Sequence, residues 1–215
     1  FGGIGTYVKA GHEAHSDVGD PANDRIRVNA EALRVKVVGE GANLGVTQKG
    51  RIEAGLAGVR LNTDAIDNSG GVNSSDVEVN INIALAAAMR ADRLDRSARN
   101  KLLSAMTDEV AGLVLNDNYR QNQTLSLMER MAQTRLGSKM HFIRTLEAQG
   151  LLDRQIEDLP SDADMAERKA RGQGLTRPEL SVLLSYSKLV AYPQLLESDV
   201  PEDPYLSKEL LRYFP

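Results

Sequence analysis

Two segments in the first third of the chain run from apolar residues into a turn of small and polar residues and then into a predicted helix. The first passes from residues 37–38 into the turn at 39–43, and the second from residues 61–66 into the turn at 67–71. This order predicts parallel strands, because parallel neighbours need a crossover connection that is usually a helix. Ligands bind at the carboxyl ends of the strands in open α/β sheets. We therefore expect both turns side by side at one edge of a nucleotide-type domain, facing a shared crevice.

Each of these turns carries an asparagine, and a pair of serines follows the second turn. The amides of Asn43 and Asn68 both donate and accept hydrogen bonds, which suits a ribose hydroxyl or a carboxamide. A helix that begins near Ser74 or Ser75 would offer a hydroxyl and backbone N–H groups to a carboxylate. The same residues also fit ordinary turns and a helix N-cap, so the pattern alone leaves both interpretations open. Glu40 is expected to be a partner of a turn or helix end, not a catalytic acid.

Two other motifs near the start of the chain have a weaker link to chemistry. Residues 1–6 are typical of a strand that ends in a glycine turn, but they lack both the P-loop pattern and G-x-G-x-x-G. His12 and His15 are followed by Asp17 and Asp20, which are residue types that bind metals. Small residues and a proline around them favour a solvated loop, so no metal site is predicted.

The composition limits the classes of protein that the chain can be. Hydrophobic residues make up 41% and charged residues 26%, which is typical of a globular protein, and the net charge of -4 provides no basic field for nucleic acid. The longest uncharged apolar run, residues 83–89, is far shorter than the roughly 20 residues that a membrane span needs. The absence of cysteine fits a reducing cytoplasm. We therefore expect a cytoplasmic protein without nucleic-acid or membrane partners, and the missing initiator Met predicts part of a longer protein.

The rest of the chain has helical periodicity. Asp95 is predicted to cap a long helix with apolar residues at helical spacing up to residue 114, and residues 116–118 are expected to end or bend it. Residues 176–179 form a capping-box sequence with proline in the first turn. The predicted fold class is α/β, with a partial Rossmann-type parallel sheet in residues 1–90, followed by an all-α helical region in residues 91–215.

Each of the two turns carries a distinctive short motif. Residues 40–43 read Glu-Gly-Ala-Asn and residues 68–72 read Asn-Ser-Gly-Gly-Val, and the sequence resembles glutamate dehydrogenase, which has Glu-Gly-Ala-Asn and Asn-Ala-Gly-Gly-Val. Over nearly its whole length it is similar to the large NAD-specific bacterial glutamate dehydrogenases. Two departures are Ser69 in place of the usual alanine, and Gly-Val-Thr at 45–47 in place of Pro-Thr-Thr.

The resemblance implies NAD as the cofactor and a role for each matching residue. Asn43 corresponds to the asparagine that contacts the nicotinamide ribose side of NAD, and Asn68 to the one near the nicotinamide and the substrate. Ser75 corresponds to the serine that helps to hold the distal carboxylate of glutamate. Gly2 and Gly3 correspond to a strand end that lies against the cofactor, so residues 1–90 would complete the NAD-binding domain.

The resemblance also implies what this chain does not carry. The catalytic lysine and aspartate of the family, and its glycine-rich dinucleotide fingerprint, lie earlier in the protein, so no catalytic residue is expected here. The implied reaction is the reversible oxidative deamination of L-glutamate to 2-oxoglutarate and ammonia, in a full-length homo-oligomer. The competing hypothesis is a helical interaction or regulatory module without a catalytic role.

Overall fold

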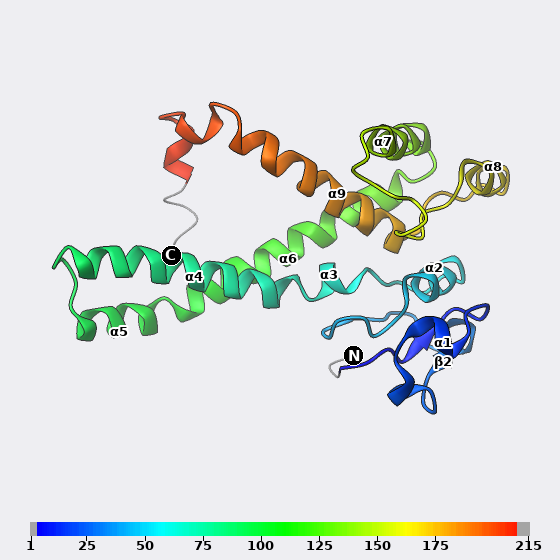
Figure 1. Ribbon diagram of the computed structural model, residues 1–215, viewed down its shortest axis with the longest axis horizontal. Coiled ribbons are helices and arrows are strands. Elements are labelled where there is room, and N and C mark those ends of the chain that lie inside the picture. Colours follow the sequence, from blue (N-terminus) through cyan, green and yellow to red (C-terminus); the bar gives the residue numbers. More distant parts are fainter. Residues whose placement is uncertain (1–3, 210–215) are drawn as a thin grey trace. The chain divides into compact units, whose positions relative to one another are not determined.

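A computed structural model describes residues 4–209, and helices predominate in it (Figure 1). Short 3₁₀ turns at Pro21–Asn23, Ala30–Ala32, Val200–Glu202 and Leu206–Glu209 connect or end the longer elements. The strands and α-helices in chain order are β1 (Val8–Lys9), α1 (His15–Val18), β2 (Val28–Asn29), α2 (Gln48–Leu56), α3 (Asp64–Asp67), α4 (Ser69–Arg90), α5 (Arg96–Ala105), α6 (Thr107–Arg130), α7 (Leu136–Ala148), α8 (Asp162–Ala170) and α9 (Arg177–Leu196).

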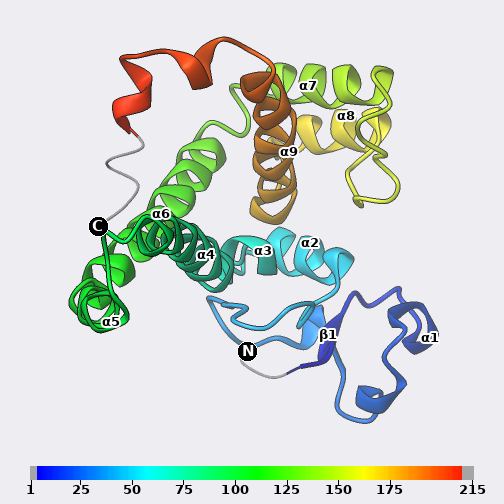
Figure 2. The same cartoon turned by 60° about the vertical axis from the view of Figure 1, so that its left-hand side comes forward.

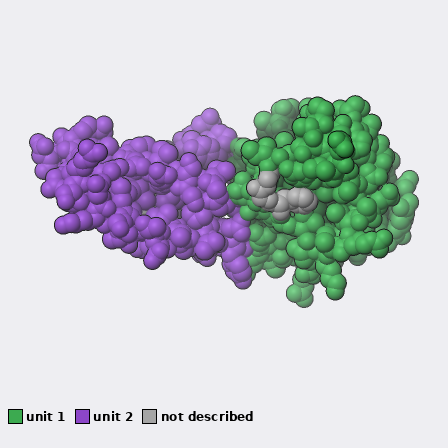
Figure 3. All heavy atoms as spheres, turned by 90° about the horizontal axis from the view of Figure 1, so that it is seen from below, with its two compact units in different colours: residues 1–68, 121–189 green, residues 69–120, 190–215 purple. Residues whose placement is uncertain are grey.

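The chain divides into two compact units (Figure 3). Unit 1 consists of residues 1–68 and 121–189, and unit 2 of residues 69–120 and 190–215. This division reflects contacts within the chain and does not test the predicted boundary near residue 90, which stays a prediction.

Unit 1 contains a small parallel sheet. β1 and β2 pair in parallel, and isolated parallel bridges extend the pattern to residues 37, 46 and 60. The paired residues are Val8–Val28, Lys9–Asn29, Val8–Val46 and Val37–Arg60. Parallel pairing was therefore predicted correctly, but a Rossmann-type sheet is not established. The prediction of an extended segment over residues 61–66 is wrong in its second half, because α3 begins at Asp64.

Two sets of apolar side chains form the core of unit 1. The first lies between the parallel segments and α2, and includes Val8, Ala30, Val38, Val46, Ala54 and Leu61. The second comes from α6 to α9, where helical spacing places one apolar face inward. Its most buried members are Leu125, Ile143, Leu146 and Leu180. Figure 2 shows α7, α8 and the first half of α9 close together in this unit.

The start of α2 fixes how closely this helix approaches the sheet. The Thr47 side chain accepts a hydrogen bond from the Gly50 backbone N–H at 3.0 Å, which confirms the predicted N-cap. A Cβ at Gly50 would lie 3.0 Å from the carbonyl carbon of Lys9 and 3.2 Å from the nitrogen of Ala10. A side chain at this position would therefore push α2 away from the end of β1.

Unit 2 is built around α4, α5 and residues 107–120 of α6. Asp95 caps a helix as predicted, since its side chain accepts a hydrogen bond from Ala98 N–H at 2.7 Å. The prediction that this helix continues to residue 114 is wrong, because α5 ends at Ala105 and α6 begins at Thr107. The helix does not end at residues 116–118, where an end or a bend was predicted, because α6 is continuous from Thr107 to Arg130. The apolar side chains that pack α4 against the following helices are Val77, Ile81, Leu85, Leu94, Leu103, Met106 and Val110.

The start of α4 also differs from the prediction. The helix begins at Ser69, directly after Asn68, and Ser75 lies about two turns inside it. The glycines at 70 and 71 lie in its first turn. Ser74 donates its hydroxyl to the carbonyl of Gly70 at 2.7 Å. Neither serine therefore sits at a helix N-terminus.

Across residues 4–209, none of the helices has both the length and the apolar character that a membrane span requires.

Candidate functional site

The two asparagine turns meet in unit 1. Asn68 Nδ2 donates a hydrogen bond to Asn43 Oδ1 at 3.2 Å. Asn43 is exposed and Asn68 is half-buried, so the pair is accessible from solvent. The prediction that the two turns lie side by side is confirmed, while the contact of either residue with NAD stays a prediction. Gly2 and Gly3 lie outside the described residues, and Ser75 is exposed on α4 in unit 2.

The backbone beside Asn43 is held in an uncommon conformation. Leu44 has a φ of 58°, in the left-handed region, which costs a residue with a Cβ about 1–2 kcal/mol. Two hydrogen bonds hold it there. The Leu44 N–H donates to Asp64 Oδ2 at 2.8 Å, and the Leu44 carbonyl accepts from Thr6 Oγ1 at 2.7 Å. The backbone directly after Asn43 is therefore held by contacts with residues outside its own turn.

A buried ion pair fastens the same turn to α2. The Glu40 side chain is fully buried, and its carboxylate accepts from Arg51 Nε at 2.6 Å and from the second Arg51 nitrogen at 2.8 Å. It also accepts the backbone N–H of Val46 at 3.0 Å, and Arg51 lies 3.2 Å from Asp64. These contacts agree with the expectation that Glu40 is a structural partner of the turn.

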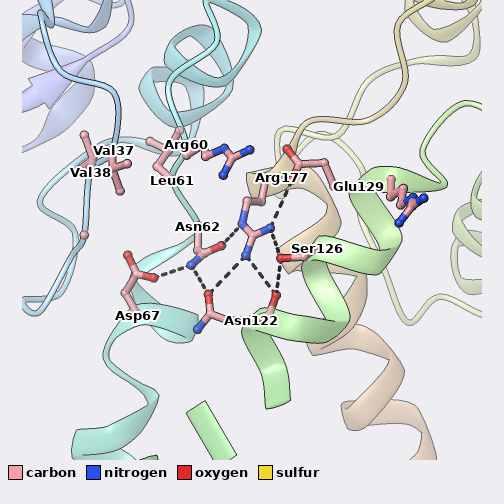
Figure 4. A pocket seen from close by; sticks show the side chains of 12 residues that line it. Val37, Val38, Arg60, Leu61, Asn62, Asp67, Asn122, Ser126, Glu129 and Arg177 are labelled. Carbon is pink, nitrogen blue, oxygen red and sulfur yellow. Dashed lines mark hydrogen bonds and ion pairs between the residues drawn. The ribbon is translucent and has the colours of Figure 1, made fainter. Parts of the chain in front are cut away.

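A pocket of about 640 Å³ lies next to these turns within unit 1 (Figure 4), and its lining includes Gly39 and Asp67 but neither Asn43 nor Asn68. It lies where the parallel-bridged segments around Val37 and Arg60 end. Its volume is in the range of small-molecule sites, roughly 300–1,000 Å³. The residues that line it are Val37, Val38, Gly39, Arg60, Leu61, Asn62, Asp67, Asn122, Ser126, Glu129, Arg130 and Arg177.

The polar wall of this pocket is a set of hydrogen-bonded side chains centred on Arg177, which we name the Arg177 cluster. Its members are Arg177, Asn62, Asp67, Asn122, Ser126 and Glu129, and Figure 4 shows their contacts. Arg177 Nε donates to Asn62 Oδ1 at 2.5 Å, and Asn62 Nδ2 donates to Asp67 Oδ1 at 2.5 Å. The sequence predicted Arg177 only as part of a helix start. No local pattern indicates a contact across the 115 positions that separate it from Asn62.

A second pocket in unit 1, of about 680 Å³, contains none of the predicted site residues. His12 and Asp158 are among the side chains that line it. Burial raises the pKa of the Asp158 carboxyl, and Lys49 at 3.7 Å acts in the opposite direction. Among the residues that the structure describes, no three His, Asp or Glu side chains gather to bind a metal ion.

Comparison with known sequences gives two family matches. Residues 1–128 match the sequence model described as bacterial NAD-glutamate dehydrogenase, catalytic domain. Residues 172–215 match the model described as glutamate dehydrogenase, C-terminal.

Individual relatives resemble the chain over its full length. It is 54% identical to the NAD-specific glutamate dehydrogenase of Pseudomonas aeruginosa, 52% to that of Halomonas elongata and 46% to that of Mycobacterium tuberculosis, each over 214 residues. The chain spans 13% of the length of each of these relatives. Because the catalytic-domain match covers more than half of the sequence, the chain belongs to the bacterial NAD-glutamate dehydrogenase family.

Proposed function

We propose that this chain supplies cofactor- and substrate-positioning surfaces to an NAD-dependent glutamate dehydrogenase. The reaction would be the reversible oxidative deamination of L-glutamate to 2-oxoglutarate and ammonia. The observation that carries the proposal is the 3.2 Å hydrogen bond between Asn43 and Asn68. It joins two motifs that lie 25 positions apart, both of which the family resemblance links to the nicotinamide end of NAD.

The chemistry of the two amides fits such a ligand. Each amide carries two donor hydrogens and a carbonyl acceptor, so their mutual bond uses only part of this capacity. Ribose hydroxyls and a carboxamide need both donors and acceptors, and the adjacent pocket has small-molecule dimensions. When bound, NAD would accept the hydride from the substrate. Asn43 and Asn68 would orient its nicotinamide end, and Ser75 would bind the distal carboxylate of glutamate.

The remaining parts of the proposal concern the longer protein. Catalytic acid–base residues would come from its other segments, and residues 1–90 would complete its NAD-binding domain, with Gly2 and Gly3 against the cofactor. Residues 91–215 would form a helical domain, and the full-length enzyme would act in the cytoplasm as a homo-oligomer.

Alanine in place of Asn43 or Asn68 in the full-length enzyme is expected to raise the KM for NAD by about tenfold, since each change removes hydrogen bonds to the ligand. Steady-state kinetics with varied NAD and varied glutamate measure this. Asn116→Ala is the matched control, because Asn116 is an exposed asparagine on α6. If neither substitution changes the kinetics of NAD or glutamate, the positioning role is wrong and the regulatory-module alternative is favoured.

The 215-residue chain on its own is expected to have no dehydrogenase activity, because the proposed acid–base residues lie elsewhere in the longer protein. NADH formation from glutamate and NAD, followed by absorbance, tests this. A rate above that of a heat-treated sample would contradict the assignment of the chain to positioning alone.

A further inference from the structure

We infer that Arg177 is a positioning residue that holds the two asparagine turns in their relative arrangement, acting through Asn62 and Asp67. The inference deepens the proposed function and rests on it. Arg177 is far from both turns in the sequence and is the first residue of α9.

The connection is an unbroken series of short hydrogen bonds within unit 1. Arg177 Nε donates to Asn62 Oδ1 at 2.5 Å, and Asn62 Nδ2 donates to Asp67 Oδ1 at 2.5 Å. The other oxygen of Asp67 accepts the backbone N–H of Glu40 at 2.9 Å. The series therefore leads from the start of α9 to the first residue of the Glu-Gly-Ala-Asn motif.

Asp67 contacts both turns because of its position. It is the last residue of α3 and directly precedes Asn68, so the position of its backbone determines the position of the Asn68 backbone. Its side chain simultaneously anchors the turn that carries Asn43, through Glu40. A displacement of the Asp67 carboxylate would change the geometry at both asparagines.

Arginine is the side chain that this position requires. Besides Asn62, the guanidinium donates to Ser126 Oγ at 3.1 Å and to the Asn122 carbonyl at 3.2 Å, and it lies 3.3 Å from Glu129. One planar group with five donors can satisfy these acceptors together, whereas lysine offers a single point charge. Arg177 therefore locks the Asn62 amide to the end of α6.

The amide of Asn62 can act as a relay because it is enclosed. Asn62 is 7% exposed, and the Arg177 side chain is 14% exposed. Asn62 uses its carbonyl for Arg177 and its NH₂ group for Asp67 and for Asn122 Oδ1 at 2.9 Å. The orientation of the amide is thus fixed on both sides. A 180° rotation would place its NH₂ group against the Arg177 donors and its carbonyl against the Asp67 carboxylate.

The test uses the full-length enzyme and compares Arg177→Met with Arg171→Met. Arg171 is the matched control, because its ion pair with Glu167 is exposed on both sides. We expect Arg177→Met to raise the KM for NAD by about tenfold, and Arg171→Met to leave it unchanged. A purely structural role would lower the amount of active enzyme and hence the apparent kcat, without changing the KM. That outcome would overturn the inference.

A second set of variants tests the relay without removing the arginine. Asn62→Asp keeps an acceptor for Arg177 but places a carboxylate against Asp67, so it should also raise the KM for NAD about tenfold. Adding Asp67→Asn restores the hydrogen bond with its direction reversed, because the amide at position 67 can donate to the carboxylate at position 62. The KM for NAD should then return to within about twofold of that of the parent enzyme. An unchanged KM in Asn62→Asp, or no rescue in the double variant, would overturn the inference. This set also decides the question if Arg177→Met does not fold.

The alanine variants of Asn43 and Asn68 separate this inference from the proposed function. If they leave the kinetics unchanged, the proposed function fails, and the positioning inference fails with it. If they raise the KM for NAD while Arg177→Met and Asn62→Asp do not, only the inference fails.

Discussion

Replacing Glu40 with alanine should lower the free energy of local opening of the turn that carries Asn43 by about 3–5 kcal/mol. The Glu40 carboxylate is fully buried and receives two bonds from Arg51 and one from the Val46 backbone. Its removal leaves the guanidinium of Arg51, which is 4% exposed, with Asp64 at 3.2 Å as its remaining carboxylate. The large effect follows because a buried charge without its main partner cannot recover its hydration.

Hydrogen exchange of the full-length enzyme, followed by mass spectrometry, measures this opening. Peptides from residues 39–56 should exchange faster by roughly two to four orders of magnitude in Glu40→Ala. Glu167→Ala is the control, since its ion pair with Arg171 is exposed and should contribute less than about 1 kcal/mol. Equal exchange in both variants would show that the buried pair does not hold the turn.

Alanine at Glu179 should destabilise the first turn of α9 by about 3 kcal/mol. Glu179 is fully buried, and its carboxylate accepts from Arg168 at 2.8 Å. It also accepts the backbone N–H of Thr176 at 2.6 Å and the Thr176 hydroxyl at 2.7 Å. One substitution therefore removes the ion pair with Arg168 and the two hydrogen bonds from Thr176 at the start of the helix. It also leaves Arg168, whose side chain is 15% exposed, without the Glu179 carboxylate.

Peptides from residues 176–183 report this change in the same exchange experiment. Glu179→Gln should cost less than Glu179→Ala, because its amide oxygen can still accept the Thr176 N–H while the ion pair is lost. If the two variants exchange at the same rate, the contact with Thr176 contributes nothing and the ion pair alone stabilises the helix start.

Features that depend on neighbouring residues could be predicted from the sequence. The caps by Thr47 and Asp95 are confirmed, because an N-cap needs only a hydroxyl or carboxylate three residues before a free N–H. The adjacency of Asn43 and Asn68 also followed from the order of strands and turns. The contact between Thr176 and Glu179 followed from the capping-box spacing.

Three other features, which depend on tertiary packing, could not be predicted in this way. Residues 61–66 look extended from their apolar spacing, yet α3 begins at Asp64. The carboxylates of Asp64 and Asp67 accept the backbone N–H groups of Leu44 and Glu40, which lie 20 and 27 positions earlier. The asparagines and aspartate at 116–118 suggest a break, but Asn118 donates to Ser69 at 2.8 Å and α6 continues. The Arg177 cluster brings together residues from three separate stretches, which no periodicity indicates.

The way in which the Asn43 turn is anchored has a consequence for its synthesis. The N–H groups of Glu40 and Leu44 find their acceptors in Asp67 and Asp64, which lie 27 and 20 positions later. A backbone donor without a partner stays hydrated, and the turn remains open in this state. On the ribosome we therefore expect this segment to stay unfolded until α3 has left the exit tunnel, so the turn that carries Asn43 would fold only after translation has passed well beyond it.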